Sequence, residues 1–390
     1  MAETTGASGA IRGVPGPDHL VAGRYRLTSK IGGGGMGAVW LARDERLERD
    51  VAAKQVISTE GLTQEEADEL RRRALHEGRL AARLQHRNAV AMYDVALDRG
   101  EPWLVMEYLP SRSLAQVLHM TGSMPERQVA QIGAQMADAL VEAHEAGIIH
   151  RDIKPGNILI ANRGRASGTV KLSDFGIARA KGDDAGPTGI ITGTPAYFAP
   201  EVARGTEPSE ASDLYSLGAT LYTALEGAPP FGVDEDSIAL LHKVALGQIN
   251  PPKNDGPLVR VILDMLQPSP KRRPSLIEAR DRLAAVAAGG GNPAAILAAP
   301  LQATEGAPAV WLRRTAGERT PGDRAPSART TASGPIERKR PIPPAPRPSA
   351  YVPPPVAPPS KMSNTVLAAW IIGGFIVLAA IIAGIIIALG

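Results

Sequence analysis

The chain carries a dense group of reactive side chains between residues 150 and 157, where it reads HRDIKPGN between two apolar runs. Polar residues between strands normally form only a loop, but this run combines too many different functional groups for that reading. A carboxylate such as Asp152 can accept the proton of a hydroxyl group, and Lys154 can neutralise a phosphoryl group. The amide oxygen of Asn157 can bind Mg²⁺. The run therefore predicts a catalytic centre for phosphoryl transfer.

A second carboxylate lies at the end of an alternating strand. In the run 169–174, TVKLSD, the side chains of Val170, Leu172 and Asp174 fall on one face because strand side chains alternate. Asp174 thus continues an apolar face and is followed by a Phe-Gly pair, so we expect its carboxylate to be positioned at a site. It would supply a metal ion with a second oxygen ligand, which binds a divalent cation more strongly than the amide oxygen of Asn157 does.

A glycine-rich turn at 32–39, GGGGMGAV, contains the pattern G-x-G-x-x-G-x-V. The pattern alone is weak, because flexible turns and dinucleotide-binding folds share it. A dinucleotide-binding turn opens into a helix, whereas both 25–27 and 39–42 are strand-like here. The glycines are therefore predicted to join two strands in a hairpin, where backbone N–H groups can approach a triphosphate.

Two opposite charges complete the set of candidate residues. Lys54 ends a predicted strand, and a capping box formed by Thr63 and Glu66 starts a helix that we expect to run to about Gln85. Glu77 is the only charge in the apolar stripe of that helix, so it should face inward and meet a cation. We expect Lys54 to be that cation, holding its ammonium group over the α- and β-phosphates.

The composition excludes several classes of protein. The chain has 390 residues, with 44% hydrophobic and 21% charged residues, as in ordinary globular proteins. Cysteine is absent, which excludes a disulfide framework, a thiolate metal site and a cysteine nucleophile. Of 43 basic and 40 acidic residues, ten and three lie between Arg313 and Lys361, which leaves 33 against 37, a net charge of −4, up to Leu312. The excess of basic over acidic residues is thus confined to the tail, and we expect no nucleic-acid partner.

The pattern along the chain predicts four segments. Residues 1–22 lack an apolar run and are expected to be a flexible tail, not a signal peptide. In residues 23–287, segments with a regular hydrophobic period alternate with short turns rich in Gly, Asp and Pro, as expected of one compact domain. Residues 288–363 are rich in Pro, Ala and Arg, which predicts a disordered juxtamembrane linker.

Residues 364–389 are predicted to form one transmembrane helix. Their apolar core of about 25 residues would extend roughly 37 Å, more than the hydrocarbon thickness of a bilayer. Basic residues flank only the N-terminal side, which places the compact region in the cytoplasm of a single-pass cell-membrane protein. Small-residue pairs such as Ala369 with Gly373 could let two spans associate as a homodimer, although small residues are frequent in any span.

These motifs, in this order, resemble the eukaryotic-type (Hanks-type) serine/threonine protein kinases, most closely the membrane-anchored kinases of actinobacteria. The resemblance covers residues 23–287. It implies an α+β protein kinase fold of two lobes, with a small β-rich N-terminal lobe ending near Tyr108 and a larger helical C-terminal lobe. ATP would lie in the cleft between the lobes, and Ser or Thr hydroxyls of protein substrates would accept its γ-phosphoryl group.

The resemblance also implies roles for individual residues. Asp152, Lys154 and Asn157 would form the catalytic loop, and Asn157 and Asp174 would hold Mg²⁺ or Mn²⁺. Met106 would be the gatekeeper of the adenine site. The implied ATP-binding residues are Ile31, Gly32, Gly33, Gly34, Gly35, Met36, Gly37, Ala38, Val39, Ala52, Lys54, Glu77, Met106, Glu107, Leu109 and Leu159.

In the same family, an activation segment would run from the Asp174 motif to the Ala-Pro-Glu motif at 199–201. Thr188 and Thr192 are its candidate regulatory phosphorylation sites, and Arg151 is a cation with which a phosphothreonine could pair. A further ion pair is expected between Glu201 and Arg273. Asp213 is expected to brace the catalytic loop, and proteins with phosphothreonine-reading FHA domains are possible partners.

Three functions are compatible with such a fold: an active kinase, a pseudokinase scaffold and a membrane receptor that chiefly transmits a ligand signal. The complete set of predicted catalytic residues argues against the scaffold, and a single residue after the predicted span argues against an outer sensor. Two departures from the family pattern are Ala53, where a larger residue is common, and Gly78. A glycine within a helix is either tolerated there or makes the helix easy to displace.

Overall fold

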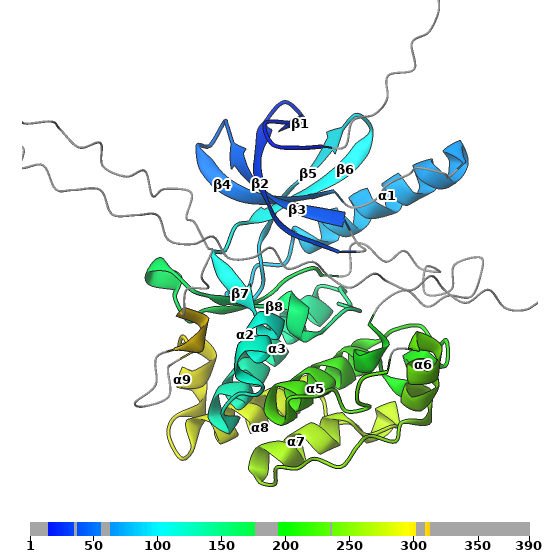
Figure 1. Cartoon of the computed structure of the whole chain (residues 1–390), viewed down its shortest axis with the longest axis vertical. Helices are drawn as coiled ribbons and strands as arrows, with labels where there is room; N and C mark the ends of the chain where they lie inside the picture. Colours follow the sequence, from blue (N-terminus) through cyan, green and yellow to red (C-terminus); the bar gives the residue numbers. More distant parts are fainter. Residues whose placement is uncertain are drawn as a thin grey trace, which may run out of the picture. The chain divides into compact units, whose positions relative to one another are not determined.

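The computed structural model describes residues 15–34, 37–55, 63–175, 194–234, 236–301 and 309–312. The described residues belong to one compact unit of the chain. Figure 1 shows a β-rich N-terminal lobe above a mainly helical C-terminal lobe, as predicted from the sequence. A site between the lobes is therefore built from side chains of both lobes.

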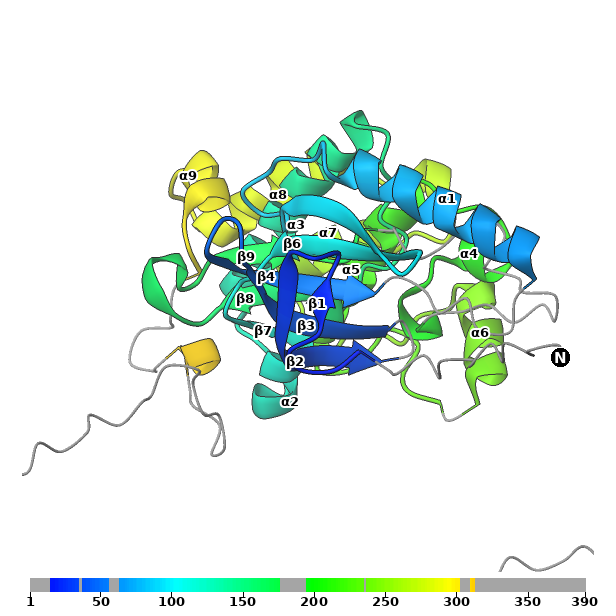
Figure 2. The ribbon, with the colours of Figure 1, turned by 90° about the horizontal axis from the view of Figure 1, so that it is seen from above.

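The N-terminal lobe is built on an antiparallel sheet whose strand order is β1-β2-β3-β4-β6-β5. The helix α1, Gln64–Ala81, packs against β5 and β6, and Figure 2 shows it along that side of the sheet. The strands are β1 Leu20–Val21, β2 Tyr25–Gly34, β3 Gly37–Asp44, β4 Arg49–Gln55, β5 Met92–Asp98 and β6 Glu101–Glu107.

Strand β4 shows how alternation serves both faces of this sheet. Val51 and Ala53 are buried in the core of the lobe, whereas Ala52 belongs to the cluster beneath α1 and Lys54 lines the cleft. Ala53 lies opposite Trp40 in the β3–β4 ladder and shares a core with a second indole. The small side chain of Ala53 leaves room for the two indole rings. This packing accounts for an alanine at a position where a larger residue is common in the family.

The predicted capping box of α1 is confirmed. The N–H of Glu66 donates to the Thr63 hydroxyl at 3.3 Å, and the N–H of Thr63 donates to the Glu66 carboxylate at 2.8 Å. The helix ends at Ala81, earlier than the predicted Gln85, because tighter bonds from Arg83 and Leu84 to the preceding turn close it.

Gly78 has a packing role that neither reading of the sequence anticipated. It is buried where α1 crosses β5 and β6, and a Cβ atom there would lie 2.7 Å from Val95 Cγ2 and 3.3 Å from Leu104 Cδ2. The missing side chain therefore allows the helix to approach the sheet closely. Because Glu77 is its neighbour, this contact also determines how far the Glu77 backbone lies from the sheet.

The C-terminal lobe surrounds the buried helix α3, which contacts α5 and α8. A small sheet of order β7-β8-β9 lies between this lobe and the cleft. Its strands are β7 Ser111–Ser113, β8 Ile158–Ala161 and β9 Val170–Leu172. The helices are α2 Leu114–Thr121, α3 Glu126–Glu145, α4 Pro200–Ala203, α5 Glu210–Glu226, α6 Ser237–Leu246, α7 Pro257–Met265, α8 Leu276–Ala288 and α9 Pro293–Ala298.

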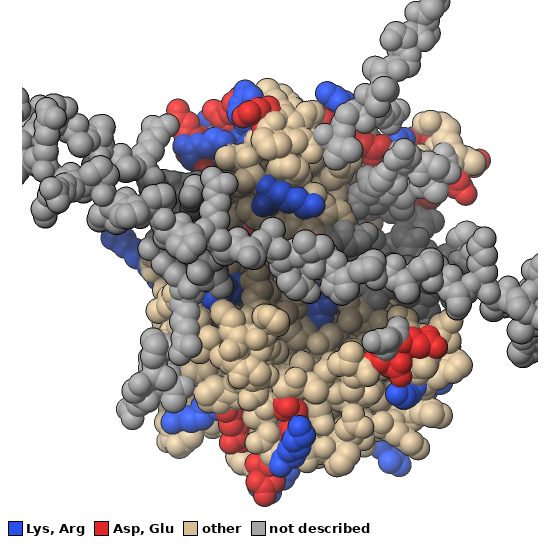
Figure 3. All heavy atoms as spheres, viewed as in Figure 1, with Lys and Arg blue, Asp and Glu red and all other residues tan. Residues whose placement is uncertain are grey.

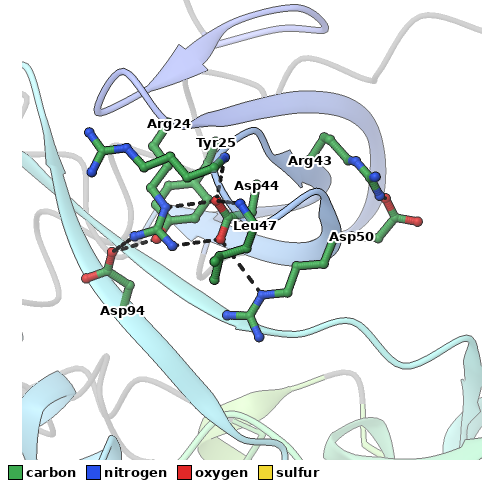
Figure 4. Close-up of polar contacts among 9 residues, drawn as sticks. Arg24, Tyr25, Arg43, Asp44, Leu47, Asp50 and Asp94 are labelled. Carbon is green, nitrogen blue, oxygen red and sulfur yellow. Dashed lines mark hydrogen bonds and ion pairs between the residues drawn. The ribbon is translucent and has the colours of Figure 1, made fainter.

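A buried carboxylate fixes the turn between β3 and β4 (Figure 4). Asp44 is completely buried and accepts two 2.8 Å hydrogen bonds from the Arg24 guanidinium, together with backbone N–H groups of Arg46 and Leu47. The bonds from Arg24 are the main cause that holds the pKa of Asp44 below its usual range. A charge this deeply buried is stable only because all these donors surround it.

The C-terminal lobe continues beyond the boundary predicted at residue 287. Helix α9 packs on α3 and α8, and Leu301 and Trp311 are buried in the core of the lobe. The disordered linker predicted from residue 288 therefore does not begin there, because a few apolar side chains within an Ala- and Pro-rich stretch find a preformed surface.

The predicted membrane span can be compared only with the helices that the structure describes. None of the helices in the described part of the chain is both long and apolar enough to cross a bilayer. The span predicted at 364–389 lies outside the described residues, as do most of the predicted N-terminal tail and the linker from 313 onward.

Gly78→Ala should destabilise the protein, although alanine is normally the better helix former by about 1 kcal/mol. The added Cβ must displace Val95 or the helix, and overpacking of this kind costs about 1–3 kcal/mol. Urea unfolding of the variant measures the change in the free energy of unfolding. Val95→Ala provides the control, since Gly78→Ala in that background should be nearly neutral. A stabilising effect in the native background would show that the contact with Val95 is unimportant.

Candidate active site

A cleft of about 1200 Å³ lies between the lobes, which are seen above and below in Figure 3. Both lobes contribute to its lining, since strands β2, β3, β4 and β6 form one wall and the β7–β9 region forms the other. The predicted residues that line it are Ile31, Gly32, Gly33, Gly37, Val39, Ala52, Lys54, Met106, Glu107, Leu109, Asp152, Lys154, Asn157, Leu159 and Asp174.

The remaining predicted ATP-binding residues are Gly34, Gly35, Met36, Ala38 and Glu77. Ala38 packs against the core of the N-terminal lobe because it alternates with Gly37 and Val39. Gly34 is the last residue of β2, and Gly35 and Met36 lie outside the described residues. Glu77 lies on α1 and is treated below with its ion pair.

The glycine-rich turn has the strand–turn–strand form predicted for it. Gly32 lies opposite Val39 in the β2–β3 ladder, and Gly34 lies opposite Gly37. Gly37 has a φ of +99°, and a Cβ there would lie 2.7 Å from the carbonyl oxygen of Gln55. Glycine is therefore required for the hairpin to pass close to β4, and the dinucleotide-binding alternative, which needs a helix at this point, is wrong.

The three predicted catalytic residues converge around one carboxylate. The Lys154 ammonium lies 2.8 Å from Asp152 Oδ2, and the Asn157 amide N–H₂ donates to the same oxygen at 3.0 Å. The Asn157 amide also donates to the Asp152 carbonyl oxygen at 2.7 Å, which closes the loop on itself. The short 3₁₀ turn Pro155–Asn157 brings the amide back to this position. Asp152 is thereby fixed in orientation while its carboxylate lines the cleft.

Asp213 braces this loop from beneath, as predicted. Its carboxylate is 1% exposed and accepts the N–H groups of His150 at 2.7 Å and Arg151 at 2.9 Å. Arg151 has a φ of +66°, a left-handed conformation that costs a non-glycine residue of order 1–2 kcal/mol. The buried carboxylate offsets that cost and so sets the direction in which Asp152 leaves the backbone.

His150 connects the catalytic loop to the segment that carries Asp174. Its Nε2 lies 3.0 Å from the carbonyl oxygen of Ser173, and its ring lies 4.8 Å from the Phe175 ring, measured between centroids. Burial lowers the pKa of His150, so the imidazole is neutral at physiological pH. The neutral His150 side chain therefore packs against Phe175 and hydrogen-bonds to Ser173. These two contacts hold the backbone on either side of Asp174.

The predicted pair between Lys54 and Glu77 is replaced by two other ion pairs. Lys54 Nζ lies 2.5 Å from Asp174 Oδ1, and the Glu77 carboxylate lies 3.7 Å from the Arg151 guanidinium. Helical periodicity correctly placed Glu77 inward, but two cations and two carboxylates meet in this region. Which cation pairs with which carboxylate depends on where α1 stands relative to the loop, and periodicity carries no information on that distance.

The residues present fit a divalent cation held together with phosphate oxygens. The Asn157 amide nitrogen faces Asp152, so its oxygen is the atom that remains for a ligand, and Asp174 offers a carboxylate. The described part of the chain contains no group of three or more His, Asp or Glu side chains that would hold a metal alone. Oxygens of a nucleotide would therefore have to complete the shell, as Mg²⁺ commonly requires.

The predicted pair of Glu201 with Arg273 is confirmed. The two groups form bidentate hydrogen bonds of 2.6 and 2.7 Å and are buried. Arg273 also donates to the carbonyl oxygens of Ala211 and Gln267. This network joins α4 to the turn before α8, and it anchors the C-terminal end of the expected activation segment. Thr188 and Thr192 lie outside the described residues.

Several lining residues were missed by the sequence analysis. Most of them come from the segment after β6, from β7, from α2 and from the turn after β8, where nothing in residue type or spacing separates a cleft-facing side chain from a solvated one. The main additional lining residues are Val90, Tyr108, Pro110, Ser111, Arg112, Ser113, Ala115, Gln116, His119, Met120, Gly156, Asn162, Arg163, Ser173 and Thr194.

Comparison with known proteins gives a consistent result. A family model of the protein kinase domain matches residues 25–283. The chain is 42% identical over 233 residues to serine/threonine-protein kinase PknB of Mycobacterium leprae, which covers 58% of this chain and 36% of that protein. The Mycobacterium tuberculosis PknB is 41% identical over 234 residues, with the same coverage.

A third relative, serine/threonine-protein kinase pkn3 of Myxococcus xanthus, is 35% identical over 272 residues, or 66% of this chain and 49% of that protein. The chain thus spans about a third to a half of the length of these relatives.

Acidification should weaken the fold through His150. Because burial lowers its pKa, the unfolded chain binds this proton more tightly than the native chain. The free energy of unfolding should therefore fall below about pH 6.5, by at most about 1.4 kcal/mol per pH unit. Urea unfolding at pH 7.5 and 5.5 tests this, since His150→Phe should lose less stability between the two values than the native protein. His76→Gln, at an exposed position, is the control. Equal losses in all three proteins would contradict the assignment.

Proposed function

The chain belongs to the protein kinase family, and from this membership we propose that it transfers the γ-phosphoryl group of ATP to Ser and Thr hydroxyls, its own included. The observation that carries the proposal is the convergence of Lys54, Asp152, Lys154, Asn157 and Asp174 on one cleft. A scaffold without activity would have no need of this complete set.

The geometry supports a positioning mechanism. Asp152 is held by Lys154 and Asn157, so its carboxylate can orient an acceptor hydroxyl and accept its proton. As the hydroxyl oxygen bonds to the γ-phosphorus, the bond from that phosphorus to the β,γ-bridging oxygen breaks, and ADP leaves. Lys154 lies beside Asp152 and neutralises charge on the transferred group. Little covalent assistance is needed, so orientation and charge account for the rate.

The cation would be Mg²⁺ or Mn²⁺, held by Asn157 and Asp174, and it would neutralise phosphate charge. Adenine would meet the hinge, where Met106, Glu107 and Leu109 line the cleft next to Ala52. These apolar and backbone groups suit a flat ring. The proposal therefore includes ATP and a divalent cation as cofactors.

The two ion pairs observed in place of the expected one support regulation by the activation segment. Arg151 lies near Glu77, and Lys54 holds the carboxylate that a cation would need. A phosphothreonine in the segment would attract Arg151. Loss of the Arg151 contact would remove one competitor of Lys54 for Glu77, and a Lys54 drawn to Glu77 would leave Asp174 to the cation. We propose Thr188 and Thr192 as the residues whose phosphorylation starts this exchange.

The cellular setting is proposed from the sequence alone. An apolar run at 364–389 after a basic segment favours a single-pass membrane protein with a cytoplasmic kinase domain. Homodimerisation through that segment and recruitment of FHA-domain proteins belong to the same proposal.

Asp152→Asn should lower phosphoryl transfer by about 10²–10⁴-fold, the usual contribution of a general base. Its affinity for ATP should stay within twofold, because Asp152 acts on the acceptor. Incorporation of phosphate from labelled ATP and calorimetric ATP binding measure the two quantities on one preparation. Lys54→Met is the matched variant, since it should impair nucleotide handling as well. Transfer at the native rate by Asp152→Asn would contradict the mechanism.

Replacing both Thr188 and Thr192 by alanine should leave the enzyme in its low-activity form. The expected result is a lower initial rate on a protein substrate and no increase after preincubation with ATP. Arg151→Ala should likewise abolish the response to preincubation, because no cation then receives the phosphate. A double alanine variant that is activated like the native protein would exclude these two threonines as the switch.

A further inference from the structure

The described residues 289–301 and 309–312, together called the strap below, lie beyond the region matched by the kinase family. That match ends at residue 283, yet α9 and the short turn Val310–Leu312 are part of the C-terminal lobe. Figure 1 shows α9 in yellow and the turn in orange on the same side of the lobe.

The buried face of α3 contains polar groups that the strap satisfies. Gln131 and Gln135 are 9% and 2% exposed and lie one helical turn apart. Gln135 donates to the carbonyl oxygens of Ile296 and Ala299 at 2.9 and 2.7 Å, and Gln131 donates to that of Ala299 at 3.0 Å. Buried amide donors without such partners are costly. The two side chains thus indicate that the strap is a permanent part of this lobe.

The strap is also bonded to the hairpin that carries cleft residues. Leu301 donates its N–H to the Gly168 carbonyl oxygen at 2.8 Å. Gly168 has a φ of +82°, and a Cβ there would lie 2.6 Å from the Leu301 carbonyl oxygen. Gly168 lies between β8, which brings Leu159 to the cleft, and β9, which leads to Asp174.

The end of the strap packs against α2, whose other residues line the cleft. The turn Val310–Leu312 contacts α2, and Trp311 is 3% exposed whereas Leu312 is 49% exposed. Gln116, His119 and Met120 of α2 belong to the cleft lining. One helix therefore touches the strap and the nucleotide cleft at once.

From these contacts we propose that the strap is a positioning element of the ATP cleft and that Trp311 is its main anchor. This inference rests on the proposed kinase function. By holding α2 and the β8–β9 hairpin, the strap fixes the positions of the cleft-lining residues that these two elements carry. Because the chain continues from Leu312, any partner or membrane attachment that pulls on the following residues acts on Trp311 and so on nucleotide affinity.

Steady-state kinetics of the full-length protein test the proposal. Trp311→Ala should raise the KM for ATP at least about fivefold, the lower end of coupling between separate sites, with kcat within twofold. Trp311→Phe should retain most of the native KM, and Leu312→Ala should leave it unchanged because that side chain is half exposed. A lower melting temperature with an unchanged KM would reduce Trp311 to a packing residue and overturn the proposal.

A second measurement on the native protein covers the case in which Trp311→Ala fails to fold. Coupling is reciprocal, so ADP with Mg²⁺ should slow amide hydrogen exchange in 309–312 and α2 by a comparable factor. Unchanged exchange there, with slowing in the glycine-rich turn, would overturn the strap's role while leaving the kinase assignment intact. If the native protein binds ADP and shows no phosphoryl transfer, the proposed function fails instead.

Discussion

The cleft depends on one buried carboxylate, that of Asp213. It accepts the N–H groups of two successive residues and thereby holds Arg151 in a left-handed conformation that the backbone would otherwise avoid. This bend directs Asp152 toward the cleft, where Lys154 and Asn157 fix its carboxylate. His150 extends the same support to the strand end at Asp174. Asp152 and Asp174 are therefore positioned from beneath, by Asp213 and His150.

Residue type and spacing predicted the parts of the site that are local in sequence. The glycine hairpin, the α1 capping box and the catalytic loop each depend on side chains within about eight residues of one another, so their geometry follows from short-range rules. The partner of Lys54 was not predictable in this way. Four charged groups from four segments compete there. The outcome depends on a distance between α1 and the loop that only packing, including the contact of Gly78 with Val95, decides.

The strap shows a second limit of reasoning from composition. Its Ala- and Pro-rich sequence cannot form a core of its own, which is why the sequence indicated a linker. Three buried side chains, Leu301, Ala309 and Trp311, nevertheless find a surface already built by other helices. The indication lay outside the strap, in Gln131 and Gln135, whose spacing on the inner face of α3 requires acceptors. Buried polar residues on a helix can thus reveal a neighbour that composition hides.

The central claim is that these positioned groups transfer a phosphoryl group to serine or threonine. The most direct measurement is incubation of the purified full-length protein with ATP and Mg²⁺, followed by mass-spectrometric mapping of every modified residue. We expect phosphothreonine or phosphoserine that requires ATP, at positions that include the segment 176–193. A protein that binds ATP with ordinary affinity and leaves every Ser and Thr unmodified, on itself and on added proteins, would contradict it.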